Sequence, residues 1–165
     1  MLAGMLGHNI TGGEVSRLSS ATRQRACEDG PVVRIATSPE EIDAAQALRY
    51  RVFYEELNGR PSIAAKWRLR DFDVFDRVAD HLVVRDPKHG PGAAGVVAAV
   101  RLLRGRVARS LPTCLPAPGF SVAADFNIEP LLSWSGEVVE ISRFCIHPEF
   151  RSRRTVGKLC QGIAT

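Results

Sequence analysis

Two ionic side chains interrupt an otherwise apolar run between Val138 and Ile146. The run reads V-V-E-I-S-R-F-C-I, and its apolar residues would fall on both faces of an extended chain. This pattern is typical of a strand covered on both sides, so Glu140 and Arg143 are predicted to be buried. Burying a charge is costly unless it is paired and hydrogen-bonded. The two residues are therefore either a structural ion pair or part of a functional site.

A further charge falls on the inward stripe of a helix predicted over residues 39 to 57. Residues 38 to 41, S-P-E-E, supply an N-cap, a proline at the first helical position and a capping-box glutamate. The apolar stripe includes Arg49, whose guanidinium either extends to solvent or points into a polar pocket. Arg51 lies on another face, where we expect a solvated charge with a helical partner. A mixed polar loop is predicted over residues 58 to 70.

Two aspartates follow this loop, and Asp73 and Asp76 alternate there with phenylalanines. We interpret them as acidic residues of a surface loop, because the segment lacks the Gly and the terminal Glu of an EF-hand. Residues 81 to 85 and 94 to 103 then form two apolar runs separated by a turn-rich link, which predicts an antiparallel hairpin. Arg101 lies at the end of its second strand.

A basic segment follows the charged strand and leads into a helical pattern. Free backbone N–H groups at a helix start, supported by the helix dipole and by arginines, can bind a phosphate. The residues predicted for this turn are Arg151, Arg153, Arg154, Thr155 and Gly157. The alternative is a basic helix start that is capped by Thr155 and binds no ligand.

Composition limits the class of protein. With 165 residues and 45% hydrophobic content, the chain fits one soluble domain over residues 31 to 165, preceded by a mobile leader over residues 1 to 30. The net charge of +4 favours an acidic partner such as nucleic acid, an anionic membrane face or an acidic carrier protein. The four cysteines lie far apart, which predicts reduced cytosolic thiols and no metal site. No signal peptide or membrane span is predicted.

The order of the predicted elements resembles that of the N-acetyltransferase-like (GNAT) fold. Six motifs in order also resemble the ornithine Nα-acyltransferases, which make lyso-ornithine lipid from a 3-hydroxyacyl carrier protein. They are L-R-Y-R-V-F from Leu48, D-x-x-D from Asp73, D-H-L-V-V from Asp80, V-R-L-L from Val100, D-F-N-I from Asp125 and E-I-S-R-F-C-I-H-P from Glu140. The resemblance covers about residues 32 to 163. It implies an α/β (α+β) fold with a mixed, mostly antiparallel twisted sheet flanked by helices, of which the C-terminal part is missing.

The resemblance also implies a reaction, in which a (3-hydroxy)acyl group moves from acyl carrier protein to the α-amine of ornithine. The donor would be the phosphopantetheine thioester of the carrier protein, held by the basic turn, with no permanently bound cofactor. Glu140 would act as the base that takes a proton from the ammonium. A bulge in its strand would turn backbone N–H groups toward the thioester oxygen. The expected catalytic network consists of Arg49, Asp73, Asp76, Arg101, Glu140 and Arg143.

Other readings stay open. Acyl-homoserine-lactone synthases share the same signature, and Ser142-Arg143-Phe144 is nearer to theirs. An N-acetyltransferase that uses acetyl-CoA is another, although Leu159 stands where its turn would place Gly or Ala. A non-enzymatic phosphate-binding module is a third, but the basic segments carry no RNA-binding signature, so no nucleic-acid partner is predicted. The expected location is cytoplasmic, and a peripheral contact at the inner membrane face is the alternative that stays open.

Overall fold

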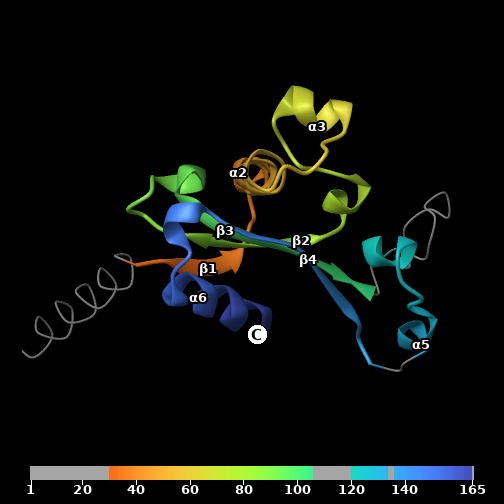
Figure 1. Cartoon of the computed structure of the whole chain (residues 1–165). Coiled ribbons are helices and arrows are strands. Elements are labelled where there is room, and N and C mark those ends of the chain that lie inside the picture. The colour runs from red at the N-terminus through yellow and green to blue at the C-terminus, as the bar shows by residue number, and fades with distance from the viewer. Residues whose placement is uncertain (1–29, 106–119, 134–135, 165) are drawn as a thin grey trace, which may run out of the picture.

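A four-stranded antiparallel sheet forms the centre of the domain. The computed structural model describes residues 30–105, 120–133 and 136–164. The strands lie in the sheet in the same order as in the sequence (Figure 1). They are β1 (Val32–Ile35), β2 (Asp80–Arg85), β3 (Val96–Arg104) and β4 (Val139–Ile146). The predicted hairpin is therefore confirmed, and β4 lies at an edge of the described sheet.

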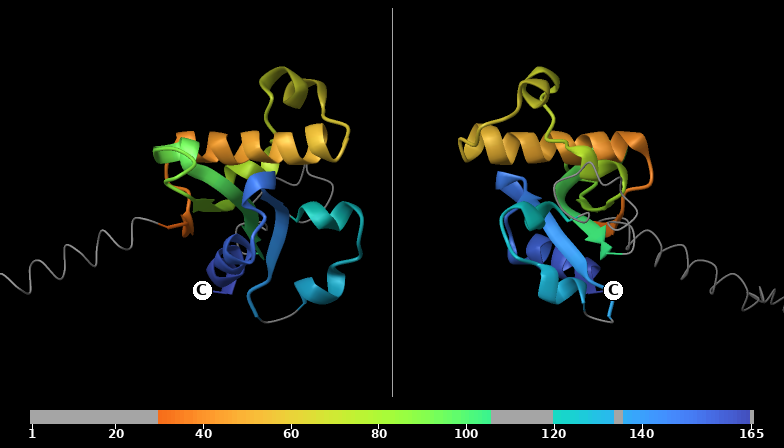
Figure 2. Two further views of the ribbon diagram at one scale, coloured as in Figure 1. Left: turned by 60° about the vertical axis from the view of Figure 1, so that its left-hand side comes forward. Right: turned by 90° about the vertical axis from the view of Figure 1, so that its right-hand side faces the viewer.

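One long helix covers each face of this sheet (Figures 1 and 2). On one face lies α2 (Pro39–Tyr50), which continues as the π-helical segment η1 (Arg51–Glu56). As predicted, Ser38 is the N-cap of α2, and its side chain accepts a hydrogen bond from the Glu41 N–H. On the other face lies α6 (Arg153–Ala164), with the fully buried Leu159 against the sheet. The layer order fixes which side chains of each strand meet which helix.

Short helical segments connect these elements. They are α3 (Ile63–Arg68), η2 (Val74–Arg77), η3 (Gly92–Gly95), η4 (Ser121–Ala124), α5 (Glu129–Leu132) and η5 (Pro148–Phe150). The prediction of a loop over residues 58 to 70 is wrong, because α3 lies within it. Ser62 caps α3 by accepting a hydrogen bond from the Ala65 N–H at 3.1 Å, a local signal that the sequence contains.

The prediction that β4 is covered on both sides is also wrong. Val139, Ile141 and Phe144 are 40%, 51% and 42% exposed. In the described part of the chain, α6 packs mainly on β1, β2 and β3, and β4 pairs only with β3. The exposed apolar residues of β4 therefore stay open to solvent.

Two predicted segments fall outside the described residues, wholly or in large part. They are the leader over residues 1 to 30 and the basic loop over residues 104 to 119. Within the described ranges, no helix has the length and apolar character needed to cross a membrane.

Candidate active site

Arg49 lies on the sheet-facing side of α2 and is only 1% exposed. Its Nε donates to Oδ2 of Asp71 at 2.8 Å. Its Nη1 and Nη2 donate to the two carboxylate oxygens of Asp76 at 2.9 and 2.8 Å. Bidentate pairs of this kind are the strongest hydrogen bonds that side chains form. Of the two interpretations of Arg49, the polar pocket is confirmed.

Three groups around Arg49 have shifted pKa values. Tyr54 donates its hydroxyl to Oδ1 of Asp71 at 2.8 Å, and burial together with this bond raises the pKa of Tyr54 to about 12. Burial opposes ionisation of Asp76, but the hydrogen bonds and charge of Arg49 outweigh it and hold the Asp76 pKa below its ordinary value. Burial lowers the pKa of His81, whose Nε2 lies 3.7 Å from Oδ1 of Asp76. The favoured state is thus an ionised Asp76 beside a neutral imidazole.

Asp73 and Asp76 form a capping box at the start of η2. The Asp73 N–H donates to Oδ2 of Asp76 at 3.0 Å, and the Phe75 N–H donates to Oδ1 of Asp73 at 2.9 Å. The side chains of Asp73 and Asp76 are 27% and 6% exposed, so the prediction of an acidic surface loop is wrong. Both carboxylates turn inward because Arg49 and Arg101 compensate their desolvation.

Arg101 on β3 connects the carboxylates of η2 with that of β4. It is 1% exposed, and its Nη1 donates to Oδ1 of Asp73 at 2.7 Å. Its Nε and Nη2 donate to the hydroxyl oxygens of Ser142 and Ser121 at 3.1 and 3.2 Å. Nη2 also lies 3.9 Å from Oε1 of Glu140. One guanidinium therefore spans the site from the capping box to the edge strand.

Glu140 is buried, as predicted, and faces the same side of the sheet as Arg101. Its Oε2 accepts the backbone N–H groups of Ser121 and Val122 at 2.6 and 3.2 Å. Its Oε1 accepts the Ser121 hydroxyl. An ionised carboxylate has about four acceptor positions. Glu140 thus anchors η4 and keeps capacity for one more donor.

The predicted bulge is present in β4. The register with β3 shifts so that two residues, Arg143 and Phe144, oppose the single residue Val100. Arg143 has a φ of +55°, in the left-handed region. Side chains alternate along a strand, so the extra residue brings Arg143 to the same face as Glu140.

Arg143 is the least enclosed member of the network. Its Nη2 donates to Oδ2 of Asp73 at 3.3 Å, and its Nε lies 3.2 Å from Oδ2 of Asp71. That Nε is buried and forms no hydrogen bond, while the whole side chain is 38% exposed. The prediction of full burial is therefore wrong for Arg143, because the bulge lies where the edge strand meets solvent.

We expect Arg143→Gly to be more stable than Arg143→Ala. Both variants lose the guanidinium, but only Ala retains the cost of a left-handed backbone, about 1 kcal/mol for a residue with a Cβ. Urea unfolding of the two variants measures this difference, with the wild type as reference. Equal midpoints would show that the bulge stores no backbone strain.

In the predicted phosphate-binding turn, Arg151 already has a partner. Its Nη1 and Nη2 each donate to a carboxylate oxygen of Glu56 at 2.5 Å, and its Nε donates to the Ile146 carbonyl at 3.2 Å. An anion that enters the turn must therefore compete with Glu56 for this guanidinium.

The other residues of the turn differ in their roles. Arg153 and Arg154 are exposed, whereas Thr155 is buried. Ser152, not Thr155, caps α6, because its Oγ accepts the Thr155 N–H at 3.3 Å. Gly157 is exposed, and a Cβ added there would meet no described atom within 4 Å. Packing therefore does not require a glycine at this position.

A second contact joins η1 to the end of β4. Nη1 of Arg51 lies 2.7 Å from Nε2 of His147, so the predicted helical partner of Arg51 is replaced by a histidine 96 residues away. Burial, followed by the positive charges of Arg51 and His89, lowers the pKa of His147. The neutral ring accepts from the guanidinium. Together with the Glu56 pair, this contact fixes the end of η1 against the basic turn.

Sequence reasoning missed several members of the site. Asp71 precedes Asp73 by two residues in D-F-D, a spacing that could have suggested it. Ser121 gives no sequence signal, because it lies 19 residues from Glu140 and meets it only in the fold. Tyr54 lies five residues after Arg49, a spacing that an α-helix does not bring to one face, and the two share Asp71 because the chain is π-helical from Arg51.

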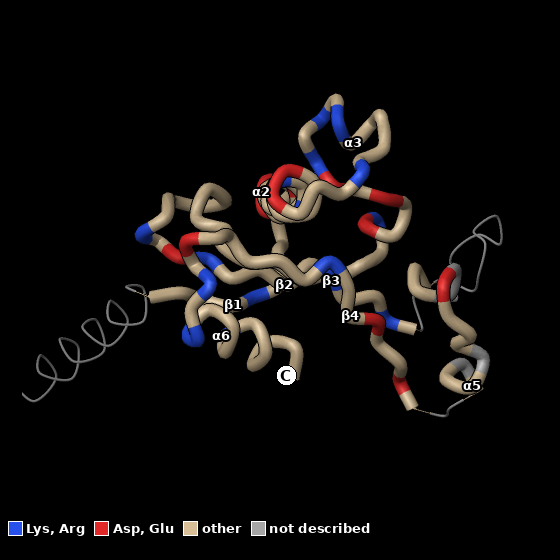
Figure 3. Tube along the Cα trace, in the orientation of Figure 1, with Lys and Arg blue, Asp and Glu red and all other residues tan. Residues whose placement is uncertain are grey.

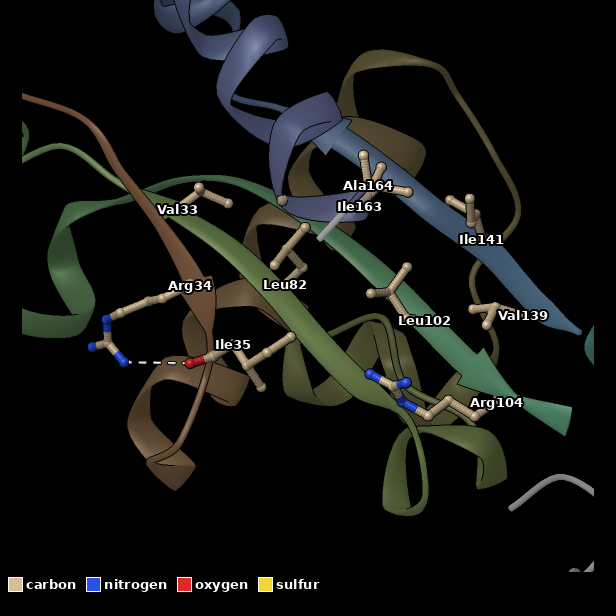
Figure 4. Close-up of a pocket in the computed structure, with 11 residues that line it drawn as sticks. Val33, Arg34, Ile35, Leu82, Leu102, Arg104, Val139, Ile141, Ile163 and Ala164 are labelled. Atoms are coloured by element: carbon tan, nitrogen blue, oxygen red, sulfur yellow. Dashed lines mark hydrogen bonds between the residues drawn. The ribbon is translucent and has the colours of Figure 1, made fainter. Parts of the chain in front are cut away.

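Two hollows border β4. One, with a volume of about 240 Å³, lies beside Glu140 and is lined mainly by apolar residues, among them Phe120, Val122, Ile128 and Leu131. The other, of about 530 Å³, lies on the opposite face next to α6 (Figure 4). Its apolar lining includes Val33, Leu82, Leu102, Val139, Ile141 and Ile163. The apolar hollow beside Glu140 thus adjoins the ionic network, whereas the larger one belongs to the open side of the sheet.

The chain belongs to the acetyltransferase (GNAT) domain family, whose model matches residues 48–161. This span contains all the catalytic residues predicted from the sequence. The predicted sheet flanked by helices is confirmed as a GNAT-type α+β fold.

Comparison with individual proteins shows which members of this family the chain is similar to. The chain is 42% identical over 132 residues to the L-ornithine N(alpha)-acyltransferases of Agrobacterium fabrum and Rhizobium meliloti. It is 39% identical over 137 residues to that of Brucella abortus. The matches cover 78–79% of this chain but only 43–45% of the relatives, so the chain spans less than half of their length.

A solved structure agrees with the fold. FeeM, an N-acyl amino acid synthase from uncultured soil microbes, matches with a TM-score of 0.54 and 13% identity. The match covers 81% of this chain and 63% of FeeM. At this identity the likeness concerns the fold alone.

Proposed function

We propose that the chain is part of an N-acyltransferase that moves a (3-hydroxy)acyl group from acyl carrier protein to the α-amine of ornithine, giving lyso-ornithine lipid. The observation that carries the proposal is the 42% identity to L-ornithine N(alpha)-acyltransferases over most of this chain. The span that the family model matches, residues 48–161, contains the ionic network, which supplies groups suited to such chemistry.

The charge balance of the network supports a cationic acceptor. The carboxylates are Asp71, Asp73, Asp76 and Glu140, and the guanidinium groups are Arg49, Arg101 and Arg143. With all of them ionised, one negative charge is unbalanced. Ornithine carries a side-chain ammonium as well as its α-amine, so such a site would attract it. The half-exposed Arg143 is positioned to pair with its carboxylate.

In the proposed reaction, the amine nitrogen attacks the thioester carbonyl, a C–N bond forms and the C–S bond breaks. The ammonium first gives up a proton, for which Glu140 is the proposed base, and the leaving thiol takes up a proton. Backbone N–H groups at the β4 bulge are proposed to stabilise the developing oxyanion. The apolar hollow beside Glu140 would hold part of the acyl chain.

The donor is proposed to bind at the basic turn. Arg153 and Arg154 are exposed at the start of α6, where the helix dipole favours an anion such as the phosphopantetheine phosphate. A net charge of +4 would assist the approach of an acidic carrier protein.

The proposal is tested by mixing the protein with 3-hydroxyacyl carrier protein and ornithine, then following thioester loss and identifying the product by mass. The chain spans less than half of its relatives' length, so we would assay both the chain and a chimera completed with the remaining part of the Agrobacterium relative. Homoserine-lactone formation from S-adenosylmethionine, or transfer from acetyl-CoA, is the matched alternative. A chimera inert with ornithine but active with either of these would overturn the assignment.

Gly157→Ala separates donor binding from folding. A mid-helix glycine is about 1 kcal/mol less favourable than alanine, and the position has open space, so we expect the variant to unfold at higher urea concentration. If the donor passes close to this backbone, KM for acyl carrier protein should rise several-fold while kcat changes little. An unchanged KM would remove Gly157 from the proposed donor site.

A further inference from the structure

The short helix α3 projects from the side of α2 that faces away from the sheet (Figures 1 and 2). Its Ala65 is 2% exposed, whereas Ile63 and Trp67 are 79% and 84% exposed. Successive residues of a helix lie about 100° apart, so Ile63 and Trp67 are each roughly 160° around the axis from Ala65. The two large apolar side chains therefore share the outer face, opposite the side by which α3 is attached.

Leu69 adds a third apolar side chain at the end of α3. It is the C-cap, with a φ of +51° and a ψ of +43°, and it is 54% exposed. This left-handed conformation favours glycine and is unfavourable for a residue with a Cβ. Neither the backbone conformation nor burial explains a leucine here.

The charged residues of the segment that carries this helix all have one sign. Residues 57 to 70 contain four cations and no acidic residue, which Figure 3 shows as blue positions along α3 and its approach. Arg70 pairs with Asp43, and Arg68 lies over the Phe72 ring. The other two, Arg60 and Lys66, are exposed and have no ion-pair partner among the described residues.

We propose that α3 docks on an anionic lipid surface. Tryptophan favours the boundary between headgroups and acyl chains, and an amphipathic helix with cations beside its apolar face binds there in the plane of the surface. Trp67 and Ile63 enter this boundary, and Arg60 and Lys66 contact lipid phosphates. A convex projection suits a flat surface, whereas a peptide ligand would need a groove. The inference concerns a surface outside the ionic network and does not depend on acyl transfer.

Flotation with phosphatidylcholine vesicles, with and without phosphatidylglycerol, tests the proposal. We expect binding that requires phosphatidylglycerol and weakens with added salt. Lys66→Glu changes the surface charge by two and should reduce partitioning about twentyfold. Trp67→Ser should reduce it about tenfold or more. In a Trp134→Phe background, which leaves Trp67 as the single tryptophan, the fluorescence should shift to the blue on binding.

Matched controls place the same changes elsewhere on the surface. Lys88→Glu alters an exposed cation of the β2–β3 turn, and Phe126→Ser alters a side chain that is 68% exposed. Both should bind vesicles like the wild type. The α3 variants should keep the wild-type circular dichroism spectrum and urea midpoint, because Trp67 and Lys66 are exposed.

Several results would overturn the proposal. One is the absence of vesicle binding, and another is equal binding by the α3 variants and the controls. Equal binding with and without phosphatidylglycerol would exclude the role of charge. If Trp67→Ser abolished self-association or carrier-protein binding while vesicles stayed unbound, the surface would be a protein interface. No acyl donor is present in these assays, so their failure leaves the proposed transfer reaction untouched.

Discussion

Arg49→Ala is expected to lower the free energy of unfolding by about 3–5 kcal/mol, the largest effect of any single substitution that we predict. The arginine is 1% exposed and pairs with both Asp71 and Asp76. Its removal would leave two buried carboxylates with a large part of their compensation lost, and they would take up protons or draw in water. Urea unfolding followed by circular dichroism at neutral pH measures the loss.

Arg70→Ala is the matched control, because Arg70 also forms a bidentate ion pair, in its case with Asp43. The side chains of that pair are 30% and 57% exposed, and solvent-exposed pairs contribute at most about 1 kcal/mol. Equal losses in the two variants would show that burial does not govern the value of the Arg49 contacts. A smaller loss for Arg49→Ala at acidic pH would agree with the lowered pKa of Asp76, since protonation removes the charge that Arg49 compensates.

Glu140→Gln is expected to reduce acyl transfer by about 10²–10⁴-fold, the usual range for the loss of a general base. The fold should persist. The amide can direct its carbonyl oxygen to the backbone N–H groups of Ser121 and Val122, and its NH₂ to the Ser121 hydroxyl, which can accept. We therefore expect a loss of only about 1 kcal/mol in unfolding free energy. Single-turnover transfer from acyl carrier protein measures the chemical step.

Glu55→Gln is the control for this experiment, because Glu55 is an exposed carboxylate on η1. It should leave transfer unchanged. If Glu140→Gln turned over at the wild-type rate, Glu140 would be a structural anchor of η4, and another carboxylate of the network, such as Asp73, would have to serve as the base.

Local patterns predicted much of the architecture. The N-cap at Ser38, the hairpin of β2 and β3 and the helix after the basic turn each depend on residues close together in the sequence. The bulge could also be predicted, because Glu140 and Arg143 are an odd number of residues apart and would otherwise face opposite sides of a strand. The polar pocket around Arg49 followed from its place in an apolar stripe.

The rest depends on contacts between distant residues. Nothing near Glu140 in the sequence indicates that Ser121 and Val122 supply its hydrogen bonds. The apolar residues of β4 suggested cover on both faces, but α6 lies over the other strands, so Ile141 is half exposed. Arg143 was predicted to be buried by the same reasoning. The type of a residue indicates which environments it tolerates, whereas its burial depends on which other element packs against it.

The strand order β1-β2-β3-β4, in which neighbours in space are neighbours in sequence, has a consequence for the folding pathway. Such a sheet can grow outward from its central hairpin by adding one strand at each side. The hairpin closes first, because β2 and β3 are joined by a short link, whereas the connections to β1 and β4 span residues 36–79 and 105–138. The guanidinium of Arg101 is carried by that hairpin, while its acceptors on β4 and η4 arrive later. Its charge is then desolvated only when the edge strand docks, so the early nucleus contains no buried unpaired ion at this position, and we expect low φ-values for residues of β4.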